Sequence, residues 1–183
     1  MTNGFSPVPE GFHTVTPYLM VSDVDTLVEF MSHAFGVEEV FRARGARSGL
    51  YVEVRVGDSM VMIGGLPRGE LQPAAIFLYM DGVDEVYRRA LEAGASSIEV
   101  PADRPSDGDR RAAFTDPFGN AWFVAARIED VSRAELQKRR DDLAQRRADP
   151  RSKRPSCSRV GLTNVAWQQI VPLLPKNGRK DKH

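Results

Sequence analysis

The sequence holds one cysteine, Cys157, no long apolar run, and no excess of charge of either sign. A single cysteine excludes a disulfide framework and a cysteine-rich zinc site. No stretch approaches the roughly 20 apolar residues of a membrane-spanning helix. Lys plus Arg and Asp plus Glu both total 25, so no net charge draws the chain towards nucleic acid or an anionic membrane. We therefore expect neither as a partner.

Composition and the first residues point to an ordinary globular protein. With 42% hydrophobic and 27% charged residues, the 183-residue chain can form one compact domain, or two small ones that share a core. Residues 1–10 have neither the basic start nor the apolar stretch of a secretory signal, so we expect a cytoplasmic location.

An internal repeat with an offset of about 60 residues organises the chain. Residues 17–40 and 76–100 each follow the same order: strand, acidic turn, amphipathic helix, glycine stop and second strand. Val24-Asp25 aligns with Val83-Asp84. Apolar residues recur at helical spacing in both helices, and in the second they are Val83, Val86, Tyr87, Ala90 and Leu91.

Three short strands are predicted after each helix. Gly57-Asp58 and Asp116-Pro-Phe-Gly-Asn120 are turn signals between the last two strands of each set. The expected strands are 38–44, 50–56 and 59–64 in the first half, and 97–101, 110–115 and 121–127 in the second. The predicted fold is α+β, with two tandem βαβββ modules.

The modules set the predicted domain organisation. The first βαβββ module spans 11–65, a linker 66–73, and the second module 74–129. A charged helix follows at 130–149, and then a basic, partly flexible tail at 150–183 that contains a short apolar segment.

Several motifs occur in an order and spacing that resemble the vicinal oxygen chelate superfamily, and within it the PhnB-like glyoxalase/bleomycin-resistance group. They include Phe12-His-Thr-Val-Thr-Pro-Tyr-Leu19, Val56-Gly-Asp-Ser-Met-Val-Met62 and Asp116-Pro-Phe-Gly-Asn120-Ala-Trp122. The resemblance implies a curved mixed sheet around a cup, with helices outside and a ligand in the concave face. It also implies a homodimer, because such cups are commonly completed across subunits.

Metal-using members of that superfamily place His or Glu on the first and last strands of each module. The matching positions here hold residues that are not ordinary metal ligands: Thr16, Met62, Ala75 and Phe123. We therefore expect neither a metal nor another cofactor. His13 is expected to fix the start of the first strand through a hydrogen bond. The alternative is a metal site formed by His13, Glu53 and a third oxygen donor.

Strand alternation predicts which side chains line the cup. A lining of aromatic and methionine side chains, with few charges, suits a flat and partly apolar organic molecule. The alternative is that these aromatic residues fill a small closed core. The predicted ligand-binding residues are Thr14, Thr16, Tyr18, Tyr51, Glu53, Arg55, Met60, Met62, Phe77, Tyr79, Arg111 and Phe123.

Three functions remain open from the sequence. The first is a metal-free protein of the glyoxalase/bleomycin-resistance type that binds an aromatic or natural-product-like molecule. The second is a metal-independent isomerase, lyase or cyclase with Glu53 as the catalytic general acid or base. Glu53 can instead form an ion pair with Arg55 or Arg111. The third is a scaffold whose tail docks a partner.

Overall fold

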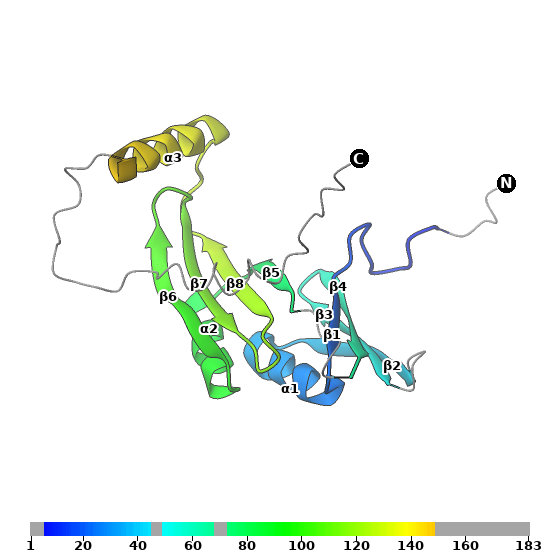
Figure 1. The fold of residues 1–183 in the computed structure, drawn as a ribbon. Coiled ribbons are helices and arrows are strands. Elements are labelled where there is room, and N and C mark those ends of the chain that lie inside the picture. Colours follow the sequence, from blue (N-terminus) through cyan, green and yellow to red (C-terminus); the bar gives the residue numbers. More distant parts are fainter. Residues whose placement is uncertain (1–5, 45–48, 68–72, 149–183) are drawn as a thin grey trace, which may run out of the picture.

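The computed structural model describes residues 6–44, 49–67 and 73–148 (Figure 1). The predictions for Cys157 and for the tail at 150–183 lie outside the described residues. Within the described ranges, no helix is long and apolar enough to cross a membrane.

The first module contains β1 (Tyr18–Val21), α1 (Val24–Phe35), β2 (Glu38–Arg44), β3 (Leu50–Val56) and β4 (Ser59–Gly65). The second contains β5 (Ala75–Tyr79), α2 (Val83–Glu92), β6 (Ser96–Arg104), β7 (Asp109–Thr115) and β8 (Ala121–Arg127). A third helix, α3 (Arg133–Ala148), follows.

Each module forms its own four-stranded mixed sheet. The strand orders are β1-β4-β3-β2 and β5-β8-β7-β6, and in each sheet the first pair is parallel and the others antiparallel. The tandem βαβββ fold predicted from the repeat is confirmed.

The first helix begins and ends where the sequence predicts. Asp23 has an extended backbone, and its carboxylate accepts a hydrogen bond of 3.1 Å from the Thr26 amide. Gly36 ends the helix with a positive φ of 69°. In α2, Val83, Val86 and Ala90 are buried, whereas Leu91 is exposed, so the prediction that Leu91 belongs to the apolar stripe is wrong.

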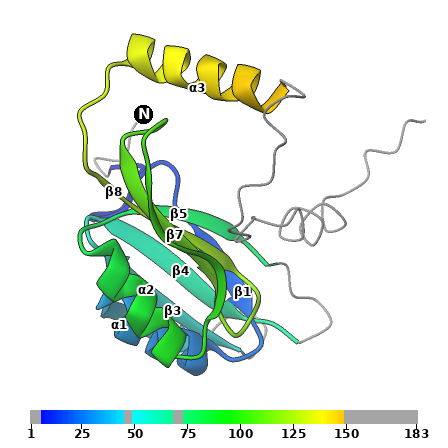
Figure 2. The same cartoon turned by 90° about the vertical axis from the view of Figure 1, so that its left-hand side faces the viewer.

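The two helices pack together and join the modules into a single hydrophobic core (Figures 1 and 2). Phe35, at the end of α1, is the clearest link between the modules. Its ring centroid lies 4.8 Å from that of Trp122 on β8 and 6.1 Å from that of Phe114 on β7. Both sheets therefore present one face to a shared interior and the other face away from it.

The turn between β7 and β8 is built around a buried carboxylate. Asp116 accepts four hydrogen bonds of 2.8–3.0 Å, from the amides of Phe118 and Asn120 and from the side chains of Asn120 and Trp122. The Asn120 side chain accepts a further bond of 2.9 Å from the Ala74 amide. These bonds fix β5 beside β8 and assign Asp116 a structural role.

Helix α3 stands apart from both sheets and approaches the hairpin of β6 and β7 (Figures 1 and 2). The sequence placed its start near residue 130. It begins instead at Arg133, where the Ser132 hydroxyl accepts a hydrogen bond of 3.2 Å from the Glu135 amide.

Candidate ligand-binding faces

The outward face of the first sheet gathers aromatic rings around a carboxylate. We call this surface face A, defined by Tyr18, Phe41, Tyr51, Glu53, Arg55 and Met62. Val52 and Val54, which alternate with its β3 members, are fully buried against the helices. The Tyr51 ring lies edge-on to those of Tyr18 and Phe41, with centroid distances of 6.2 and 6.3 Å.

Glu53 lies in the middle of face A. It is directly opposite Phe41 on β2 and Met62 on β4. The Tyr51 hydroxyl donates a 2.8 Å hydrogen bond to its carboxylate. Within the described residues no ion pair to Glu53 is found, so neither Arg55 nor Arg111 is its partner.

Two glycines shape the edges of face A. A Cβ on Gly64 would lie 2.4 Å from the Tyr18 hydroxyl oxygen, so the absence of a side chain lets Tyr18 lie across β4. A Cβ on Gly11 would lie 3.4 Å from the Arg55 guanidinium, which places the N-terminal segment beside that side chain. Met60, directly opposite Arg55, is buried but lies outside the main core.

The predicted residues nearest the N-terminus lie apart from this alternation. Because β1 begins only at Tyr18, Thr14 and Thr16 belong to the segment that precedes the strand. The Thr16 hydroxyl donates a 3.0 Å hydrogen bond to the carbonyl oxygen of His13.

The outward face of the second sheet, which we call face B, is defined by Phe77, Tyr79, Asp109, Arg111 and Phe123. Phe77 and Phe123 are directly opposite on β5 and β8, and their rings are nearly parallel with centroids 6.3 Å apart. The Arg111 guanidinium carbon lies 5.1 Å from the Phe77 centroid, a cation–π contact. Small residues surround these rings: Ala75, Ala113, Ala121 and Ala125.

On face B, the Arg111 guanidinium contacts two carboxylates. The Arg111 guanidinium lies 3.1 Å from Asp109 and 3.3 Å from Asp107, which follows β6. The Tyr79 hydroxyl donates a 3.3 Å hydrogen bond to Asp109. Burial, followed by the nearby Asp109 charge, raises the pKa of Tyr79.

Sequence reasoning missed Phe41 and Asp107. The register of β2 shifts between Glu39 and Phe41, so simple alternation does not predict on which face of the sheet the Phe41 side chain lies. Asp107 lies in a turn, and only the tertiary structure brings it to Arg111.

The residues present do not fit the metal ion that the resemblance implies for metal-using members. Tyr18 is opposite Met62, and the equivalent pair in the second sheet is Phe77 and Phe123. In the part of the chain that the structure describes, no three His, Cys, Asp or Glu side chains are grouped closely enough to hold a metal ion. The alternative site built from His13 and Glu53 therefore has no support in the geometry.

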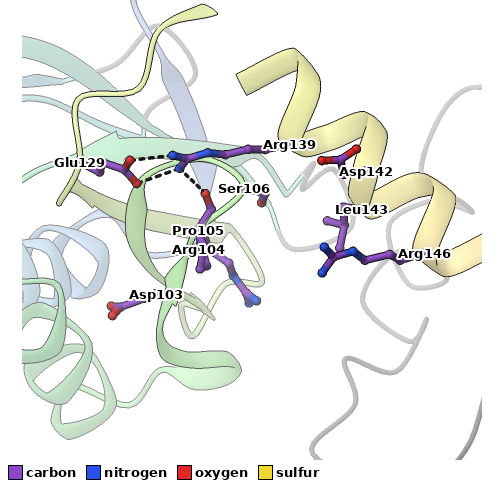
Figure 3. A pocket seen from close by; sticks show the side chains of 9 residues that line it. All are labelled: Asp103, Arg104, Pro105, Ser106, Glu129, Arg139, Asp142, Leu143 and Arg146. Atoms are coloured by element: carbon purple, nitrogen blue, oxygen red, sulfur yellow. Dashed lines mark hydrogen bonds and ion pairs between the residues drawn. The ribbon is translucent and has the colours of Figure 1, made fainter. Parts of the chain in front are cut away.

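A cleft of about 590 Å³ lies away from both faces, between α3 and the hairpin of β6 and β7 (Figure 3). Several of its charged side chains already form ion pairs: Arg139 with Glu129, Arg104 with Glu99, and Asp103 with Arg110. The cleft therefore offers a ligand fewer free contacts than the exposed aromatic rings of faces A and B.

The pKa of Tyr51 on face A provides a testable prediction. Burial, followed by the hydrogen bond to Glu53, raises the pKa of Tyr51 to about 12 from 10.0. The fold therefore favours neutral Tyr51, and this contribution to stability is complete below pH 10 and lost as the pH rises towards 12. In Glu53→Gln, we expect the pKa of Tyr51 to fall but to stay above 10, because burial remains.

Tyrosinate absorbance in a pH titration measures this shift, and Tyr51→Phe identifies the transition. A Tyr51 transition at the same pH in wild type and Glu53→Gln would show that the carboxylate does not act on the phenol.

Two linked βαβββ modules, each with an open aromatic face, define the structural class. A model of the Glyoxalase/Bleomycin resistance protein/Dioxygenase superfamily matches residues 11–124. The chain belongs to this superfamily.

The chain is also similar to two sets of proteins. Uncharacterized proteins from Mycobacterium bovis and Mycobacterium tuberculosis are 29% identical over 136 residues, which cover 67% of this chain and 89% and 79% of theirs. Three solved structures share the fold. TioX from Micromonospora sp. ML1 is 23% identical with a TM-score of 0.52, and the match covers 62% of this chain and 98% of TioX. TnmS3 from Streptomyces sp. CB03234 is 21% identical with a TM-score of 0.52 (63% of this chain, 95% of TnmS3), and FosX from Listeria monocytogenes is 17% identical with a TM-score of 0.53 (68% of this chain, 97% of FosX).

Proposed function

We propose that this protein binds a flat, partly apolar organic molecule on faces A and B without a metal. The observation that carries the proposal is the exposure of large aromatic side chains on both faces: 49% for Tyr18 and Phe41, 44% for Phe77 and 65% for Tyr79. Exposed aromatic side chains that are grouped on one face of a sheet are typical of a binding site.

The fold neighbours support the same kind of function. TnmS3 is described as an antibiotic binding protein and FosX as a fosfomycin resistance protein. A natural-product ligand is therefore part of the proposal, as are a cytoplasmic location and membership of the PhnB-like group.

A homodimer completes the proposed site. Within one chain, faces A and B belong to separate sheets that turn away from their shared core. When face A of one copy lies against face B of another, both sets of aromatic residues are covered and a ligand is held between them. Light scattering on the full chain tests this, and the expected result is twice the chain mass. A monomer at micromolar concentration would contradict it.

The binding test uses phenylnaphthylamine, an uncharged aromatic dye that fluoresces in apolar sites. We expect Phe77→Ala and Phe123→Ala each to weaken binding about tenfold, because each removes a stacking ring. Leu91→Ala, which trims an exposed apolar side chain on α2, should leave binding unchanged. Equal losses in all three variants, or no binding by wild type, would contradict the proposal.

A catalytic role for Glu53 is the second candidate. It is favoured by the position of the carboxylate, which is partly buried among aromatic rings and held by the Tyr51 hydroxyl. A side chain placed in this way can act as a general acid or base. Glu53→Gln should then abolish turnover of a substrate while leaving its affinity largely intact. Unchanged turnover excludes this role, and metal analysis of the purified protein tests the expected independence of metal.

A further inference from the structure

The tip of the hairpin of β6 and β7 lies between face B and α3, and one carboxylate faces both. Asp107 is 16% exposed. One of its oxygens lies 3.3 Å from an Arg111 Nη on face B. The other accepts hydrogen bonds of 3.1 and 3.0 Å from the Nε and an Nη of Arg140 on α3. Asp107 therefore connects the helix directly to the guanidinium that contacts the Phe77 ring.

Arg140 is not needed to hold α3 in place. The neighbouring Arg139 makes hydrogen bonds of 2.7 and 2.8 Å to both carboxylate oxygens of Glu129, and one of 2.8 Å to the carbonyl oxygen of Pro105 (Figure 3). It also contacts Glu135 within the helix. Removal of the Arg140 charge should consequently leave the helix docked and change only the environment of Asp107.

The charges around Arg111 show what Arg140 contributes. Arg111 and Arg140 supply two positive charges, and Asp107 and Asp109 two negative ones, so the cluster is neutral. Without Arg140 the same cluster carries one excess negative charge beside the Phe77 ring. Removal of Arg140 would also leave Arg111 as the one cation that neutralises the Asp107 carboxylate within this cluster. Arg111 would then attract any other anion less strongly.

We propose that α3, through Arg140, adjusts the charge of face B so that Arg111 can receive the anionic group of a planar aromatic ligand stacked on Phe77. This inference rests on the proposed binding function and adds the class of ligand and a means of control. Arg140 and Asp107 act as positioning residues, because both work through Arg111 and neither needs to touch the ligand.

The test compares two dyes that differ by one sulfonate: anilinonaphthalene sulfonate and the uncharged phenylnaphthylamine. In Arg140→Gln the sulfonate should bind about threefold more weakly, and in Asp107→Asn about threefold more tightly, as expected for partly exposed ion pairs. Neither substitution should change the affinity for phenylnaphthylamine. Changes of opposite sign in sulfonate affinity, at two residues in direct contact, distinguish charge adjustment from simple damage to the hairpin.

Two variants serve as controls. Lys138→Gln removes a positive charge from an exposed side chain of α3 that makes no ion pair among the described residues, and should leave both affinities unchanged. Arg140→Lys, which keeps the charge, should restore most of the sulfonate affinity. High salt should reduce the differences between the variants.

Each other outcome overturns a specific claim. Weaker binding of both dyes by Asp107→Asn, or equal effects of Arg140→Gln and Lys138→Gln, would overturn the role of the Asp107–Arg140 pair. If wild type binds phenylnaphthylamine but not the sulfonate, the anionic ligand class is wrong while the proposed function stands. If wild type binds neither dye, the proposed function itself fails, and this inference with it.

Discussion

Asp116→Asn should lower the free energy of unfolding by about 3 kcal/mol, because it places an amide donor where a carboxylate oxygen accepts hydrogen bonds. In the folded protein that oxygen accepts from the side chains of Asn120 and Trp122, and the whole group is buried. The corresponding loss in Tm is roughly 10 °C for a domain of this size. Chemical denaturation followed by tryptophan fluorescence measures the change.

The matched control is Asp58→Asn in the turn between β3 and β4. Asp58 is exposed and accepts one hydrogen bond, from the Ser59 hydroxyl. A surface change of this kind costs less than about 0.5 kcal/mol. Similar losses in both variants would mean that the four bonds to Asp116 contribute little, and that β5 is held beside β8 by the strand ladder alone.

Phe35→Ala should cost still more, about 4 kcal/mol, because it opens a cavity where the modules meet. The ring contacts Trp122 and Phe114 in the second module and Phe30 in its own helix. Its removal leaves a cavity between the packed face of the second sheet and α1, where Phe30 still contacts Phe114. Calorimetry and denaturant titration both report the loss.

Phe41→Ala removes the same side chain from an exposed position on face A. We expect this control to cost under about 1 kcal/mol, because little apolar surface is buried there. A loss as large as that of Phe35→Ala would show that face A is closed within the chain. That result would also remove the main support for an open binding surface.

The repeat made most of the fold predictable from the sequence, because local signals agree with the global arrangement. Asp23 and Gly36 mark the ends of α1, and the turn signals at 57–58 and 116–120 separate the strands that were expected. Alternation along β3 also separated the buried valines from the polar and aromatic residues beside them.

The contacts that the sequence does not reveal are those between distant segments. Phe35 and Trp122 carry only the signal of an apolar helix end and an apolar strand, and nothing local indicates that they meet. The ion pair between Asp107 and Arg140 is equally hidden, because charged residues in a turn and on a helix usually face water. Strand alternation also does not decide whether the aromatic residues lie on open faces or fill a small closed core, because that depends on how the modules pack.

The division of each sheet into a packed face and an open face has a consequence for how such a protein can change over generations. In β8, Trp122 and Val124 are fully buried, while Phe123 between them lies on face B. Selection can therefore replace Phe123 without disturbing the interior, and can keep its neighbours fixed while doing so. Adjacent residues of one short strand thus evolve under separate constraints. A library of variants restricted to the outward positions would yield proteins that still fold and that can be screened for new ligands.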